Sequence, residues 1–142
     1  MMLLTVTGWA DDAFGTWTMN PARSTVAPDP HPKSITIRIE PHAKGEVFTL
    51  DRIEADGRAT TSSSILYLDG QPREFQDLGC SGTQSSHRVD SQTVEVLRKC
   101  ASGEWVRLVR RLSAQPNELV LEITEHQVGR SFERHLVLER LR

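Results

Sequence analysis

The sequence lacks most of the features that quickly identify what a protein does. Its 17 lysines and arginines nearly balance its 19 aspartates and glutamates, so it lacks the basic excess typical of proteins that bind nucleic acid or anionic membranes. No apolar run approaches the ~20 residues of a membrane-spanning helix. Apolar residues make up 37% of the 142 positions, which is slightly low even with nine glycines added. We therefore expect one folded domain with a modest core, no nucleic-acid partner and no membrane insertion.

Motifs for metal binding and nucleophilic catalysis are also missing. The five histidines form neither an HxH nor an HExxH pattern, there is no CxxC pair, and there is no Gly-x-Ser-x-Gly elbow. We therefore predict neither a metal site nor a cofactor. His126 and His135 are expected to face each other across the last hairpin, as exposed residues at its rim.

Cysteine is scarce, with Cys80 and Cys100 as the two thiols. Two unconnected thiols are the favoured interpretation, because the residues do not form a close pair in the sequence. A disulfide is the alternative, because both residues lie in segments predicted to be neighbouring strands. It requires Cα atoms within about 7 Å.

The first residues resemble part of an export signal. Residues 1–10 are mostly apolar and have the small residues Gly8 and Ala10 near their end, as at the end of a secretory signal, but they lack its basic start. We predict that residues 1–13 form an N-terminal tail or signal remnant and that residues 14–142 form the domain. On this ground we expect a periplasmic or secreted protein, with a cytoplasmic one as the alternative.

From residue 34 onward, apolar and polar residues alternate with the period of two that half-buried strands show. Ile35, Ile37 and Ile39 share one face of the first such segment. Asp-Gly pairs at 56–57 and 69–70 supply the positive φ of tight turns. Prolines crowd residues 21–33, which predicts an extended loop with one helical turn near 21–23. The predicted strands are 14–20, 34–40, 47–54, 60–68, a short one around 74–75, 81–89, 93–99, 105–112, 119–123 and 132–141, with a turn at 41–45.

The spacing of these strands predicts an antiparallel meander, because turns recur every few residues and no long amphipathic helix appears. The fold class is therefore all-β. We expect a single antiparallel up-and-down β-barrel of eight to ten strands with little or no helix, since closure removes exposed sheet edges. A two-sheet sandwich is the competing arrangement.

The start of the meander resembles known barrel proteins. Gly15-Thr16-Trp17 is similar to the Gly-x-Trp signature of lipocalins and the Gly-Thr-Trp of fatty-acid-binding proteins. The string 15–24 resembles the opening of uncharacterised bacterial lipocalin-like (calycin) proteins, and the resemblance extends from residue 14 to about 140. It implies that Trp17 packs at the closed barrel end beneath an arginine of the last strand. Arg140 is the predicted partner, with Arg134 in reserve.

The chain also departs from fatty-acid-binding proteins. Their terminal Arg-x-Tyr holds a ligand carboxylate, whereas the corresponding residues here are Leu136-Val137-Leu138. Their helical lid has no counterpart, because the proline-rich loop stands in its place. A carboxylate clamp of that type is therefore not expected.

Arginines within the alternating strands are the most informative candidates for a site. Arg98 and Arg110 each share parity with the apolar residues of their strand, so both guanidiniums point inward if those faces line the interior. The favoured alternative is a bulge that turns them outward. In residues 60–68, alternation sends either Ser62 and Ser64 or Ser63 and Tyr67 inward, as polar lining. The predicted ligand-binding residues are Arg98, Arg110, Tyr67, Trp105 and Phe48.

Three functions are compatible with these features. The first is a non-catalytic carrier of a small apolar or amphipathic molecule, as a monomer or homodimer. The second is a structural or protein-interaction barrel whose interior is filled with side chains. The third is an isomerase or cyclase that uses Glu74, Arg98 and Arg110. An interior cavity of several hundred cubic ångströms distinguishes the first from the second.

Overall fold

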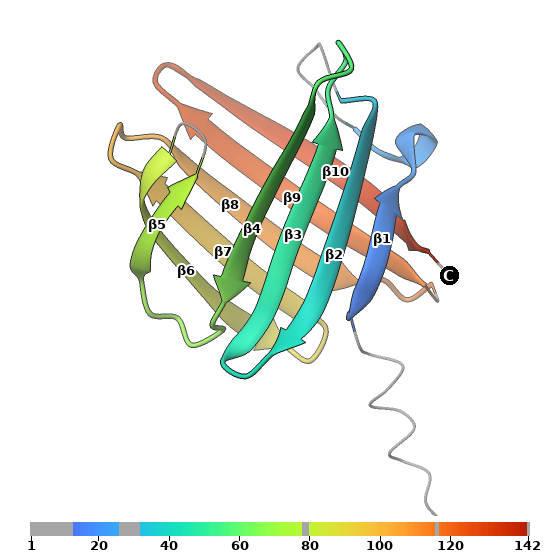
Figure 1. The fold of residues 1–142 in the computed structure, drawn as a ribbon, viewed down its shortest axis with the longest axis horizontal. Helices are drawn as coiled ribbons and strands as arrows, with labels where there is room; N and C mark the ends of the chain where they lie inside the picture. Colours follow the sequence, from blue (N-terminus) through green and yellow to red (C-terminus); the bar gives the residue numbers. More distant parts are fainter. Residues whose placement is uncertain (1–12, 26–31, 78–79, 116, 142) are drawn as a thin grey trace, which may run out of the picture.

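A computed structural model describes residues 13–25, 32–77, 80–115 and 117–141. Ten antiparallel strands wind around a nearly closed barrel (Figure 1). The last strand returns to pair with the first, which gives the order β4-β3-β2-β1-β10-β9-β8-β7-β6-β5. The strands are β1 (Gly15–Met19), β2 (Ser34–His42), β3 (Gly45–Ile53), β4 (Ala59–Leu66), β5 (Arg73–Asp77), β6 (Cys80–Asp90), β7 (Thr93–Cys100), β8 (Trp105–Leu112), β9 (Glu118–Gln127) and β10 (Arg130–Arg140), and a 3-10 turn, η1, spans Pro21–Arg23.

The predicted up-and-down barrel is confirmed, and the single sheet excludes the sandwich. The helical turn at 21–23 and the short strand around residue 75 are present. The turn at 41–45 is shorter than predicted, because β2 continues through Pro41 and pairs with β3 up to His42. The predicted tail, apart from residue 13, lies outside the described residues. Within the described residues no helix has the length and apolarity needed to cross a bilayer.

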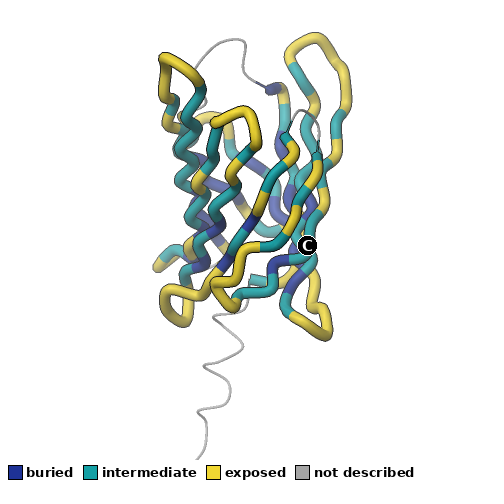
Figure 2. The backbone as a smooth tube through the Cα atoms, turned by 90° about the vertical axis from the view of Figure 1, so that its left-hand side faces the viewer, coloured by how far each residue is buried: buried dark blue, intermediate teal, exposed yellow. Residues whose placement is uncertain are grey.

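Alternation places one face of each strand inside the barrel. Figure 2 shows the buried stretches along the barrel walls and the exposed residues at the hairpin turns. The three isoleucines of β2, Ile35, Ile37 and Ile39, are buried as predicted, with exposures of 4%, 0% and 0%. The Asp-Gly turn between β3 and β4 places Gly57 at a φ of 91°, a conformation that glycine adopts without steric cost. The alternation of residues along β2 therefore determines which side chains face the interior, and the Asp-Gly pair determines where the chain turns.

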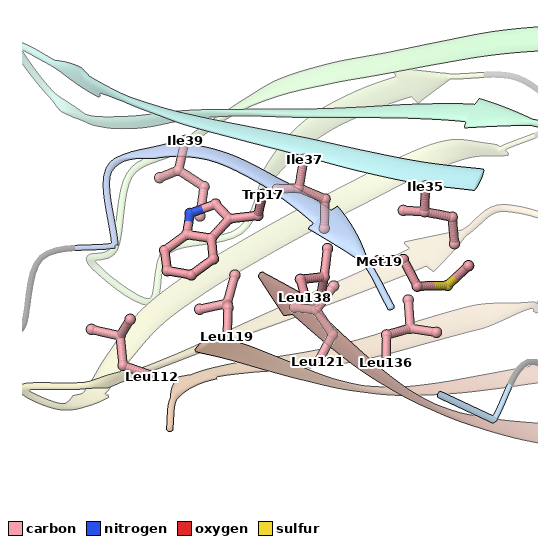
Figure 3. Close-up of a cluster of buried hydrophobic side chains, with 10 residues drawn as sticks. All are labelled: Trp17, Met19, Ile35, Ile37, Ile39, Leu112, Leu119, Leu121, Leu136 and Leu138. Carbon is pink, nitrogen blue, oxygen red and sulfur yellow. The ribbon is translucent and has the colours of Figure 1, made fainter. Parts of the chain in front are cut away.

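Part of the interior is packed solid. Trp17 is fully buried and lies beside Ile39 and Leu119, while the same cluster extends along the strands towards Ile35 and Leu136 (Figure 3). We call this cluster the filled end. It consists of Trp17, Met19, Ile35, Ile37, Ile39, Leu112, Leu119, Leu121, Leu136 and Leu138.

The barrel wall has one interruption, between β4 and β5. These strands follow each other in the sequence but form the two ends of the sheet, so no ladder joins them. The connection between them bonds to β6 instead, where Leu68 N donates to Ser86 Oγ (2.9 Å) and Gly70 N donates to the Ser86 carbonyl (2.7 Å). Farther along, Ser62 Oγ donates to the carboxylate of Asp77. We call this interruption the β4–β5 seam.

Candidate ligand-binding site

The interior becomes hollow beyond Ile35 and Leu136 of the filled end. The hollow is a cavity of about 260 Å³. It is larger than the ~150 Å³ cavity that accommodates benzene and lies just below the ~300–1,000 Å³ of usual ligand pockets. Its size therefore suits one small molecule, and we call this half of the interior the cavity end.

Most of the cavity wall is apolar, because the inward positions of seven strands carry apolar side chains. Phe48 is the aromatic residue of this wall, and it also packs against the filled end. Such a wall favours an apolar ligand through the hydrophobic effect. The apolar lining consists of Pro32, Ile35, Phe48, Leu50, Leu66, Val96, Val106, Leu108, Ile123 and Leu136.

One side of the cavity is polar. On β4 the inward positions are Thr60, Ser62 and Ser64, so alternation sends Ser62 and Ser64 inward rather than Ser63. Ser63 instead bonds Thr49 through its hydroxyl (3.1 Å). These hydroxyls lie along the β4–β5 seam, where the missing ladder brings polar side chains next to the cavity.

Arg98 of β7 reaches into the cavity from the wall beside the seam. Its Nε and Nη2 donate to the amide oxygen of Gln84 on β6 (3.1 and 2.9 Å), and its guanidinium lies 3.8 Å from the ring centroid of Phe75. Burial lowers the pKa of Arg98, and the nearby carboxylate of Asp77 offsets this only in part. A cation that is desolvated but held by a neutral amide favours an additional anion.

The carboxylate nearest to Arg98 is not hydrogen-bonded to it. Asp77 Oδ2 lies 3.8 Å from Arg98 Nη1, beyond hydrogen-bond range, and accepts a hydrogen bond from Ser62 across the seam. Asp77 therefore contacts both sides of the interruption in the barrel wall.

Two further charged pairs contribute residues to the cavity wall. Arg134 of β10 donates to Glu125 of β9, and both residues belong to the cavity wall. Arg52 of β3 also lines the cavity, and its Nη2 donates to Glu54 (3.4 Å). Arg134 therefore does not serve as the reserve partner of Trp17.

Arg110, the second predicted interior arginine, lies inside the barrel but does not line the cavity. It is 2% exposed, and its two terminal nitrogens donate to the two carboxylate oxygens of Glu46 on β3 (2.8 and 3.0 Å). Arg98 and Arg110 both point inward, so the favoured bulge interpretation is wrong for them. The register shift in this part of the sheet lies between Arg88 and Asp90.

The side chains predicted to pair at the barrel end are in contact. The Arg140 guanidinium lies 4.3 Å from the Trp17 ring and donates to the carbonyl of Phe14. Gly15 has a φ of 133°, and a Cβ there would stand 2.9 Å from Arg140 Nη1. The glycine of the Gly-Thr-Trp motif therefore leaves room for the arginine that covers the tryptophan.

Two predicted lining residues lie outside the cavity. Tyr67 stacks beneath Arg73, with 3.7 Å from the guanidinium carbon to the ring centroid. Trp105 stacks on His126, with centroids 5.4 Å apart. Successive side chains of β8 point to opposite faces, and its neighbour Val106 points into the barrel, so Trp105 faces outward.

The cysteines form a disulfide with a Cα–Cα distance of 5.1 Å, so the favoured interpretation as separate thiols is wrong. The bond joins the start of β6 to the end of β7, next to the strand positions that carry Asp77 and Arg98. The two neighbouring strands were predicted from the sequence, but the register that brings the cysteines within bonding distance was not.

The residues named for catalysis do not converge. Glu74 is exposed, while Arg110 is buried against Glu46. His126 and His135 do not face each other, because the register pairs His126 with Ser131 and His135 with Glu122. The described residues hold no cluster of three or more potential metal ligands.

No family model matches the chain, and no curated protein matches it either. Solved structures do match. A Schistosoma mansoni fatty acid binding protein in complex with arachidonic acid has a TM-score of 0.58 and 9% identity, over 91% of this chain and 96% of that one. Zebrafish ileal bile acid-binding protein in complex with cholic acid has a TM-score of 0.57 and 10% identity, over 90% of this chain and 98% of that one. Apo lipid binding protein 8 of Caenorhabditis elegans has a TM-score of 0.58 and 5% identity, over 99% of this chain and 100% of that one. The chain therefore has the same barrel fold as these proteins.

Proposed function

We propose that this protein is a non-catalytic carrier that holds one small amphipathic molecule inside the barrel, with the acidic head group of that molecule at Arg98. The observation that carries the proposal is a mostly apolar cavity with the partly buried guanidinium of Arg98 in its wall. The neighbours of similar fold are described as binding fatty acid, bile acid and lipid, which supports a ligand of this class.

The size of the cavity limits the ligand. A volume of about 260 Å³ favours a medium-length chain or a compact ring system rather than a long acyl chain. Arg98 supplies the anion contact from β7, so the ligand lies along the β5–β7 wall. This placement differs from a clamp at residues 136–138, where the chain has leucine and valine.

The test is calorimetric titration with decanoate and with decanol, which differ in the acid group. We expect saturable binding of both by the wild-type protein, with decanoate the tighter ligand. Arg98→Gln should weaken decanoate binding about tenfold or more, which corresponds to about 1.4 kcal/mol, and leave decanol binding unchanged.

Arg107→Gln is the matched control, because Arg107 is an exposed arginine on the outer face of neighbouring β8 and donates to Glu95. It should change neither affinity. The proposal fails if the wild-type protein binds neither compound, or if both arginine variants weaken decanoate binding equally.

We also propose that the protein works outside the cytoplasm, as the sequence suggested. The Cys80–Cys100 disulfide supports this, since such bonds persist chiefly in oxidising compartments. Fractionation of the source cells, with alkylation of free thiols in each fraction, tests it. Recovery of the protein with alkylated thiols in the cytoplasmic fraction would refute it.

A further inference from the structure

Asp77 lies where two features of the cavity end meet. It ends β5 at the seam, accepts a hydrogen bond from Ser62 of β4, and places a carboxylate oxygen 3.8 Å from Arg98 Nη1. The other two donor nitrogens of Arg98 are used by Gln84. Among the described residues, the third nitrogen, Nη1, therefore has the Asp77 carboxylate nearby but donates no hydrogen bond to that carboxylate.

An acidic ligand at Arg98 would meet Asp77. Two carboxylates beside one guanidinium repel each other while competing for the same charge, and partial burial strengthens both effects. The hydrogen bond from Ser62 holds Asp77 towards the seam, so the carboxylate stays at 3.8 Å rather than closing on Nη1. Ser62 thereby leaves the space beside Nη1 open to another anion.

We infer that Asp77 is a resident competitor for the ligand's acid group, and that Ser62 restrains it across the β4–β5 seam. The inference rests on the proposed function and makes these two residues determinants of specificity for anionic ligands. An anionic ligand replaces Asp77 beside Arg98 Nη1. An uncharged amphiphile gains no binding energy from this arginine.

The two residues are predicted to act in opposite directions. Asp77→Asn removes the competing charge but keeps an oxygen that accepts from Ser62, so decanoate affinity should rise about tenfold. Ser62→Ala removes the hydrogen bond that draws Asp77 towards the seam, so Asp77 can move closer to Arg98 and decanoate affinity should fall a few-fold. A merely structural role for the pair predicts that both variants bind more weakly.

Controls are available on the same strands. Ser63→Ala removes a hydroxyl from the outward neighbour of Ser62, which bonds Thr49 away from the seam, and should leave binding unchanged. Decanol should bind the Ser63→Ala control with wild-type affinity, and the ratio of decanoate affinity to decanol affinity is the quantity compared between the variants. In an Arg98→Gln background, Asp77→Asn should no longer raise decanoate affinity, which separates competition at Arg98 from a general change of charge.

Calorimetric titration of decanoate against these variants, with thermal unfolding to verify folding, decides between the outcomes. If the wild-type protein binds decanoate and Asp77→Asn binds it with equal or weaker affinity, the inference is overturned while the proposed function stands. A gain that persists without Arg98 also overturns it. Failure of all variants to bind either decanoate or decanol overturns the proposed function together with the inference.

Discussion

Two inward-pointing arginines on neighbouring strands have opposite environments. Arg110 of β8 forms a closed pair with Glu46, with two hydrogen bonds and 2% exposure. Arg98 of β7 is held by a neutral amide and has its nearest carboxylate at 3.8 Å. The first arrangement pairs the cation with a carboxylate within the protein, while the second is the one at which we propose that a ligand binds. The alternation of each strand places both arginines inside the barrel. They differ in the residue that pairs with each guanidinium.

The same contrast distinguishes the two halves of the interior. The filled end is closed by side-chain packing around Trp17, with Arg140 over the indole ring. The cavity end is lined by charged pairs near an interruption in the sheet. Substitutions should therefore affect stability at the first and ligand affinity at the second.

The largest effect on stability is expected at the Arg110–Glu46 pair. Glu46→Gln leaves Arg110 buried without its counter-ion and should lower the free energy of unfolding by about 3–5 kcal/mol. Asp77→Asn, the equivalent change beside Arg98, should alter unfolding far less. Urea denaturation of both variants measures the difference. Equal losses in the two variants would remove the contrast between the arginines.

A double variant sharpens this result. Glu46→Leu with Arg110→Met replaces the buried pair by apolar side chains and should recover much of the stability lost in Glu46→Gln, because the desolvation penalty disappears. A double variant as unstable as the single one would show that packing around these positions, rather than charge, is limiting.

The disulfide is expected to have the next largest effect, and it acts on the cavity end. Replacing Cys80 and Cys100 together by serine should lower the free energy of unfolding by about 2–4 kcal/mol, given a sequence separation of 20 residues. Amide hydrogen exchange should accelerate most in β5–β7. Acceleration spread evenly over β1, β2 and β10 would show that the two ends do not respond separately.

A smaller effect is expected at the cap of the filled end. Arg140→Gln removes the cation over Trp17 and the bond to the Phe14 carbonyl, and should cost about 1 kcal/mol. Urea denaturation measures the loss, and decanoate titration should show unchanged affinity. A change in affinity would mean that the cap and the cavity are coupled through the filled end.

The filled end was more predictable from the sequence than the cavity end. Local alternation placed the β2 isoleucines in the core, and the Gly-Thr-Trp motif suggested the contact between Trp17 and Arg140. Parity offered an inward Arg98 as one alternative, although the favoured interpretation turned it outward. These features depend on neighbours along one strand or on a recognisable motif, so the sequence contains them.

The remaining features depend on strands that meet across the barrel or across the seam. Glu46 and Arg110 are 64 residues apart, and alternation cannot show which inward residues face each other. The Ser62–Asp77 contact requires knowing that β4 and β5 do not pair. Selecting Trp105 by its aromatic character fails because parity directs Val106 inward instead.

The smallest effect is expected from acid, and it tests the filled end again. Glu118 begins β9 next to Leu119, and a hydrogen bond from Arg23 of η1 lowers the pKa of this carboxyl while burial opposes the shift. A lowered folded-state pKa contributes stability above the unfolded value of about 4.3, and that stability is lost as the pH falls through the folded pKa. Arg23→Gln should therefore lower stability slightly at neutral pH and leave it unchanged in strong acid. Thermal unfolding of the wild-type protein and of Arg23→Gln, from neutral pH to strong acid, measures the difference in stability. If this difference persists in strong acid, it comes from the packing of η1 rather than from the charge of Glu118.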